Sequence, residues 1–253
     1  MDYTMTFKEY LETQDIRVMD NIDIKIKVKN KNLCEKDVFK HIEALADFHY
    51  KTMGFQDYLK GRLDNKIGRK VEEYKVSLKR LKRDLNNINK HEDLNSFEKR
   101  LMIEAPEYIG RANNIIRIID NQFYINFIIR SMGRKEVCLS NVWLNNIICD
   151  NKNIYVKDIS DACYNLVEMD CVELIKKLRK KGYKDSCINV CKYFCSTENL
   201  GYENERFILA MASFPEEFMK ICNKYRNKKK NWGIDKYMDR LDKAILEDGE
   251  SLI

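Results

Sequence analysis

Turn-forming residues are scarce in this chain of 253 residues, which contains 9 glycines and 2 prolines. An average chain of this length would carry roughly 30 of the two together. Tight turns are therefore few, which argues against a strand-rich sandwich or barrel and favours long helices. Apolar residues make up 44% and charged residues 34% of the chain, as expected of a globular protein rather than a disordered one.

Several motifs of catalysis and nucleotide binding are absent. The chain has no GxxxxGKS/T phosphate loop, and GxGxxG, GxSxG and HExxH are missing as well. Only three histidines occur, His41, His49 and His91. Because histidine is the usual general base near neutral pH and a common zinc ligand, we expect neither a histidine-based catalytic triad nor a histidine-rich metal site.

Neither a membrane span nor a signal peptide is predicted. No stretch of ~18 uncharged apolar residues occurs, and the first residues, MDYTMTFKEYLETQD, are acidic and polar. We therefore expect synthesis in a cytoplasm and no membrane partner. The net charge of +6 is modest and both signs are interspersed, so an anionic partner is permitted but not required.

The nine cysteines do not suggest a disulfide scaffold, because their number is odd and no CxxC pair occurs. Cys187, Cys191 and Cys195 follow at intervals of four, which places them along one face of an expected helix. We expect them to be small core residues. A metal cluster and thiols that cross-link late are the alternatives.

Apolar periodicity predicts mostly helices. Residues 69–90 give the clearest pattern, since their apolar positions alternate spacings of three and four. Pro106 and Gly110 are expected to interrupt the chain, and 111–131 to form the central buried helix because the segment is apolar nearly all round. The other helices are expected at 37–52, 95–104, 165–181, 185–195, 203–212, 215–229 and 234–247.

Two segments have the character of strands. Residues 22–28 alternate between apolar and polar side chains, which predicts one exposed strand. Two apolar triplets, 147–149 and 154–156, flank the turn residues 150–153 and predict a β-hairpin. One hairpin between two blocks of helices is the order of elements in the large lobe of a kinase.

The hairpin region resembles a known catalytic segment. Residues 138–158, CLSNVWLNNIICDNKNIYVKD, are similar to the H-G-D, asparagine, hairpin and acidic-triplet pattern of aminoglycoside phosphotransferase and choline-kinase-like enzymes. More narrowly, the chain resembles the CotS family of spore-coat proteins within that superfamily. Residues 44–55, ALADFHYKTMGF, and 213–232, SFPEEFMKICNKYRNKKKNW, resemble two further segments of that family in the same order.

The resemblance implies an altered site. The position of the family's catalytic aspartate holds Asn141, while the family's asparagine is kept as Asn146 and its metal-binding aspartate as Asp158. An amide cannot accept a proton at neutral pH, and phosphoryl transfer needs a carboxylate to orient the acceptor hydroxyl. We therefore expect no catalytic residues and no cofactor, with Asn146 and Asp158 as weak candidates for a cation site.

The expected fold is mainly α, a kinase-like large lobe with a central β-hairpin. The family's small lobe carries the nucleotide-covering loop, but only about 36 residues precede the expected helix at 37–52 and none of them is glycine. We expect residues 1–36 to be a remnant of a small lobe that is largely missing, and 37–253 to be the large lobe.

The resemblance implies a non-catalytic kinase-like protein, a pseudokinase, made in the mother cell and assembled into the spore coat. Its partners would be other coat proteins or a kinase-like homologue. The alternatives are an active phosphotransferase that uses ATP and Mg²⁺ on a small hydroxyl, amine or sugar substrate, and a basic nucleic-acid-binding protein. The last rests on two lysine-rich clusters, 176–184 and 225–232, which are better explained as solvated helix ends.

Overall fold

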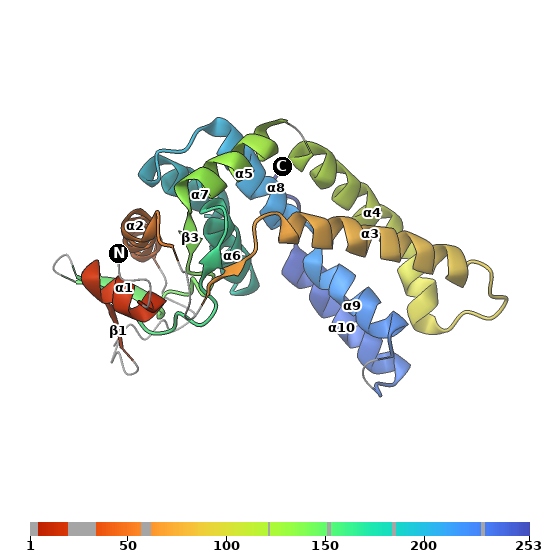
Figure 1. The fold of residues 1–253 in the computed structure, drawn as a ribbon. Coiled ribbons are helices and arrows are strands. Elements are labelled where there is room, and N and C mark those ends of the chain that lie inside the picture. Colours follow the sequence, from red (N-terminus) through yellow and green to blue (C-terminus); the bar gives the residue numbers. More distant parts are fainter. Residues whose placement is uncertain are drawn as a thin grey trace. The chain divides into compact units, whose positions relative to one another are not determined.

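The computed structural model describes residues 5–19, 34–56, 62–120, 122–150, 153–183, 186–228 and 231–253. Helices dominate these ranges and the strands are short, which confirms the mainly α prediction (Figure 1). Contacts divide the chain into two compact units, Met1–Gly68 with Gln122–Leu209 and Arg69–Asn121 with Ala210–Ile253. The strand expected at 22–28 lies outside the described residues, and the expected boundary at residue 36 stays a prediction.

The first unit combines helices with two small sheets. Helix α2 packs against α7 and also contacts the strands of the hairpin. Its buried residues Val38, Ile42, Leu45 and Phe48 recur at helical spacing, which is why this segment folds as a helix with one apolar face. The helices are α1 (Phe7–Thr13), α2 (Glu35–Thr52), α5 (Gln122–Arg134), α6 (Glu168–Lys180), α7 (Cys187–Thr197) and α8 (Tyr202–Ser213), whose last residues belong to the second unit.

The predicted hairpin is present. Strands β4 (Ile147–Asp150) and β5 (Asn153–Val156) are antiparallel, with Ile147 opposite Val156. Strand β1 (Ile16–Val18) joins this sheet parallel to β5. A second sheet has the order β2 (Asp64–Asn65), β6 (Cys163–Tyr164) and β3 (Val137–Cys138), in which β3 runs antiparallel to β6.

The second unit consists of packed helices. The helix expected at 69–90 is α3 (Arg69–Ile88), and its stripe of Val71, Tyr74, Leu78 and Leu81 is buried as predicted. Tyr74 stacks on Phe214 with ring centroids 3.7 Å apart. Helix α3 contacts α4 and α9, and α10 contacts both of those helices. Their bounds are α4 (Ser96–Ile119), α9 (Glu216–Arg226) and α10 (Ile234–Asp248).

Two predictions about the middle of the chain were wrong. Helix α4 continues through Pro106 and Gly110, so these residues do not interrupt it. The segment 111–131 is not one central buried helix, because its residues are divided between the end of α4 and the start of α5. On α5 the side chains of Ile125 and Ile129 are 58% and 62% exposed. No helix described by the structure is both long and apolar enough to cross a membrane.

Candidate functional site

The loop that follows β3 is held by a buried carboxyl group. Ser140 lies in the left-handed region with φ 61°, so the backbone turns just before Asn141. Asp170, in the first turn of α6, accepts both of them at 2.7 and 2.9 Å. Because Asp170 is 1% exposed, these bonds lie away from competing water. The side chain of Asp170 therefore shapes the loop that carries Asn141.

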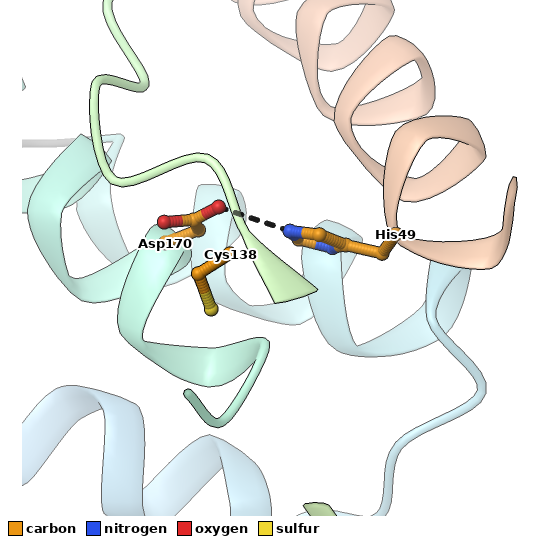
Figure 2. A group of neighbouring side chains, drawn as sticks. All are labelled: His49, Cys138 and Asp170. Carbon is orange, nitrogen blue, oxygen red and sulfur yellow. Dashed lines mark hydrogen bonds and ion pairs between the residues drawn. The ribbon is translucent and has the colours of Figure 1, made fainter. Parts of the chain in front are cut away.

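Asp170 is in turn held by His49 of α2 (Figure 2). The Nε2 atom of His49 lies 3.0 Å from Asp170 Oδ2, and its Nδ1 atom lies 2.6 Å from Glu198 Oε1. A ring whose two nitrogens both face carboxyl oxygens donates from both of them, so this imidazole is positively charged. Burial lowers the pKa of His49, but the charge of Glu198 and the hydrogen bonds that the ring donates to both carboxyl groups overcome this and raise it to about 10.

Cys138 completes a group of three potential metal ligands, which is the only such group within the described ranges (Figure 2). One ligand atom from each of His49, Cys138 and Asp170 lies within 4.8 Å of the others. The group does not fit a metal ion, because both nitrogens of His49 already donate to carboxyl groups. Burial also raises the pKa of the Cys138 thiol well above its usual value, and metals bind the thiolate.

Asn146 joins the loop to the segment after the hairpin. Its Nδ2 atom donates to the backbone carbonyl groups of Asn141 and Asp158 at 2.7 and 2.9 Å, and its Oδ1 atom accepts the N–H of Asp158 at 2.9 Å. The side chain is 2% exposed. Both donor hydrogens and one acceptor lone pair are therefore committed to the backbone, and Asn146 positions the other two candidate residues.

Asn141 and Asp158 face each other at the surface of the first unit. Nδ2 of Asn141 lies 3.5 Å from Asp158 Oδ2, and Nζ of Lys177 lies 3.5 Å from Asn141 Oδ1. The backbone N–H of Ser160 donates to Asp158 Oδ1 at 2.9 Å. This bond lowers the pKa of the Asp158 carboxyl group, which is therefore ionised at neutral pH. The loop and the hairpin thus bring together the three residues that the motif resemblance named, Asn141, Asn146 and Asp158.

These residues fit the magnesium ion of a phosphotransferase poorly. Mg²⁺ prefers several oxygen ligands in octahedral geometry, with one or two carboxylates from the protein. Asp158 offers one carboxylate, and no group of three histidine, cysteine or acidic ligands in the described part of the chain includes it. The Oδ1 atom of Asn146 already accepts a backbone N–H group.

The cysteines of α7 are core residues, as predicted. Cys187, Cys191 and Cys195 are all buried with free thiols, and in the described residues they do not form a group of metal ligands. Whether any cysteine cross-links to another chain stays a prediction. The two exposed cysteines are Cys34 and Cys149.

The described parts of the two basic clusters lie at helix ends and take part in contacts within the fold. In the cluster 176–184, Lys177 reaches the loop after β3. In the cluster 225–232, Arg226 pairs with Asp84 of α3 at 3.2 Å. In each cluster, one basic side chain therefore interacts with another residue of the protein itself.

Sequence analysis missed the residues that hold the site in place. His49, Asp170 and Glu198 are far apart in the sequence, and no local pattern connects them. The one available signal was that His49 belongs to the FH pair of the segment 44–55, which the resemblance had already singled out. A second buried network also escaped it, in which Arg130 binds Glu136 at 2.9 Å and Glu168 at 2.7 Å.

Comparisons with known proteins show the fold. No protein-family model matches the sequence, and no curated protein matches it. A solved aminoglycoside phosphotransferase from Alicyclobacillus acidocaldarius is similar, with a TM-score of 0.66 and 15% sequence identity. The match covers 83% of this chain and 61% of that enzyme, so the chain spans about three fifths of its length. At this identity the likeness concerns the fold alone, and the chain has the kinase-like fold of an aminoglycoside phosphotransferase.

Proposed function

We propose that the protein is a non-catalytic kinase-like protein, a pseudokinase, that acts by binding other proteins. The observation that carries this proposal is the amide of Asn141, which stands where the resembling motif has its catalytic aspartate. An amide cannot take a proton from an acceptor hydroxyl at neutral pH. The amide instead links two charged side chains, since it donates toward Asp158 and accepts from Lys177.

The contacts of Asn146 support the same proposal. In phosphoryl transfer an asparagine near the catalytic loop helps to hold the metal ion. Here Asn146 is buried and its amide bonds to three backbone groups. Its role is to hold the loop against the hairpin. The loop is therefore folded, but Asn146 has little capacity left to bind a metal ion. This is what we expect of a protein that acts by binding rather than by catalysis.

The biological setting rests on the resemblance to the CotS family. We propose that the protein is made in the mother cell and becomes part of the spore coat, where other coat proteins or a kinase-like homologue bind it. A fluorescent fusion expressed during sporulation tests this directly. Fluorescence that surrounds the forespore and remains with purified spore coats is expected. Fluorescence that stays dispersed in the mother cell would contradict the coat assignment.

The alternative, an active phosphotransferase, is favoured by one observation: an ionised Asp158 lies beside a well-formed loop. The decisive experiment compares the wild-type protein with Asn141→Asp and Asp158→Asn. Thermal stability is measured with ATP and Mg²⁺, and with Mg²⁺ alone as the control. Release of phosphate from ATP is followed in the same samples.

We expect no nucleotide-dependent rise in melting temperature and no phosphate release from the wild-type protein. A ligand that binds only the folded state must raise the melting temperature when it is well above its dissociation constant. Activity that appears only in Asn141→Asp would keep the wild-type protein non-catalytic and locate its defect at residue 141. Turnover by the wild-type protein that Asp158→Asn abolishes would overturn the proposal.

A further inference from the structure

A separate cavity of about 310 Å³ lies beside the second sheet of the first unit. Tyr164 of β6 forms one wall, and its hydroxyl donates to the backbone carbonyl of Phe55 at 3.1 Å, so the wall is fixed in place. None of the described residues that line the cavity is acidic, and neither Asn141 nor Asp158 lines it. The residues on which the inference rests are Phe55, Ile67, Ser131, Met132, Lys135 and Tyr164.

Two polar side chains on this cavity have no partner within the described structure. Ser131 is 0% exposed, and its buried Oγ atom makes no hydrogen bond within the described structure. Buried hydroxyl groups are nearly always hydrogen-bonded, because leaving one unpaired costs free energy. The ammonium group of Lys135, four residues later, makes no hydrogen bond or ion pair with the described residues and is half-buried.

The backbone holds Lys135 at this position. Lys135 lies in the left-handed region with φ 51°, which side chains other than glycine rarely adopt. Its carbonyl oxygen accepts the N–H of Gly54 at 3.2 Å, which ties it to the segment that contributes Phe55. The backbone that carries one cation is thus held next to an apolar surface, close to the hydroxyl group of Ser131.

We propose that this cavity binds a small organic carboxylate with a flat apolar body. The carboxylate would accept hydrogen bonds from Lys135 and Ser131, and its body would lie against Phe55, Ile67 and Met132. Charge-assisted hydrogen bonds are stronger than neutral ones, and small-molecule sites combine apolar walls with polar groups that orient the ligand. The polar side chains of Gln56 and Asn65 also line this cavity. This site is distinct from the loop after β3, and the proposal does not depend on whether the protein is a pseudokinase.

The test uses phenylacetate as the probe in a titration of the ¹⁵N-labelled protein by NMR. Phenylacetamide has the same shape without the charge, and inorganic phosphate has charge without the apolar body. We expect saturable shifts at Ser131, Lys135 and Tyr164 with phenylacetate. Binding of either control compound should be about tenfold weaker, because it lacks the charge-assisted bond or the apolar contact.

Three variants separate the site from general effects. Lys135→Gln should weaken phenylacetate binding by about tenfold. Lys228→Gln is the matched control, because Lys228 also has a positive φ of 45° but is exposed in the second unit, and it should bind normally. Ser131→Ala should weaken binding severalfold and raise the melting temperature of the free protein, since it removes an unpaired buried hydroxyl group.

The outcomes separate cleanly. Selective loss of binding in Lys135→Gln and Ser131→Ala would support the carboxylate site. Equal binding of phenylacetate and phenylacetamide would overturn it, because the cation would then play no part. Unchanged binding in Lys135→Gln, or no saturable shift with phenylacetate in the wild-type protein, would overturn it as well.

Discussion

The charge of His49 can be tested through the pH dependence of stability. Its pKa is raised to about 10 in the folded protein, against about 6.5 in an unfolded chain. The folded state therefore holds one more proton than the unfolded state between these two values. The stabilisation is fully present below pH 6.5 and is lost as the pH rises through the folded pKa near 10.

The magnitude follows from this proton difference. The free energy of unfolding should fall by about 1.4 kcal/mol for each pH unit within this window. Between pH 7 and pH 9 the contribution of His49 should therefore fall by roughly 2–3 kcal/mol, which corresponds to roughly 5–10 °C in melting temperature for a chain of this size. Lysine, tyrosine and cysteine residues titrate in the same range, so the measurement is made against a variant that shares them.

The assay compares wild-type protein with His49→Gln by urea unfolding from pH 6 to pH 9. The difference in stability should shrink as the pH rises, because glutamine cannot carry the proton. Glu198→Gln is the second variant: it removes one partner of His49 and leaves the bonds of Asp170 to Leu139 and Ser140 in place. It should lower the pKa of His49 without unfolding the loop.

Nitrogen NMR of the histidine rings gives a readout that does not depend on unfolding. At pH 7.5 both ring nitrogens of His49 should carry protons. His41, on the same helix, should be neutral at this pH, because burial lowers its pKa to about 4. One unprotonated nitrogen in His49 at pH 7.5 would refute the reasoning, as would a stability difference between wild type and His49→Gln that does not change with pH.

Three further predictions concern single residues and the thiols. In a Lys177→Gln background, Asn141→Asp should destabilise the protein by about 1 kcal/mol at pH 7 relative to Asn141→Ala, because it places a second negative charge beside Asp158 and the ammonium group that faces Asn141 is gone. Urea unfolding at pH 7 and pH 3 measures this, and an equal effect at both values would contradict it. Asn146→Ala should lower the free energy of unfolding by about 2–4 kcal/mol, because three backbone groups lose their hydrogen-bond partner. Its neighbour Asn145 is exposed, so Asn145→Ala should change the free energy of unfolding by less than about 0.5 kcal/mol in the same assay. Of the nine thiols, two should react rapidly with Ellman's reagent in the native protein and the other seven only after unfolding; more than two rapid thiols would show that the core opens readily. The two exposed thiols are those of Cys34 and Cys149.

Helix positions could largely be predicted, because burial in this protein follows periodicity. The exception at Pro106 is instructive. The buried residues Leu101, Ala105, Tyr108 and Ala112 continue the apolar stripe of α4 across the proline at spacings of three and four. The packing of this continuous stripe outweighs the local cost of a proline inside a helix. The sequence itself carries this stripe, so periodicity predicts α4 better than the rule that proline ends helices.

In α5 the composition overstates burial. Its many isoleucine and phenylalanine residues predict a buried helix, but Ile125 and Ile129 are exposed. Hydrophobic residues line much of any protein surface, so composition alone does not predict burial. The buried side of α5 includes Ser131 and Phe127, and it also carries Arg130, which binds the buried Glu136 and Glu168. Only the tertiary structure shows which face of the helix contacts the rest of the unit.

The candidate site divides into a part that the sequence could predict and a part that it could not. Asn141, Asn146 and Asp158 could be named because they lie within one short segment whose spacing resembles a known motif. His49 and Asp170 could not, because 121 residues separate them and their contact depends on how α2 and α6 pack. Local spacing predicts residues on one loop, whereas buried polar networks depend on the whole fold.

This division explains how the fold can tolerate a change at residue 141. The shape of the loop after β3 depends on Asp170, which accepts two of its N–H groups, and on Asn146, which binds the loop carbonyl. The side chain of Asn141 makes only two long contacts of 3.5 Å at the surface. A change of this side chain therefore costs the fold little, whereas phosphoryl transfer in general needs a carboxylate to orient the acceptor hydroxyl. The fold thus depends on Asp170 and Asn146 but little on the side chain of residue 141, so resemblance in the fold carries little information about activity.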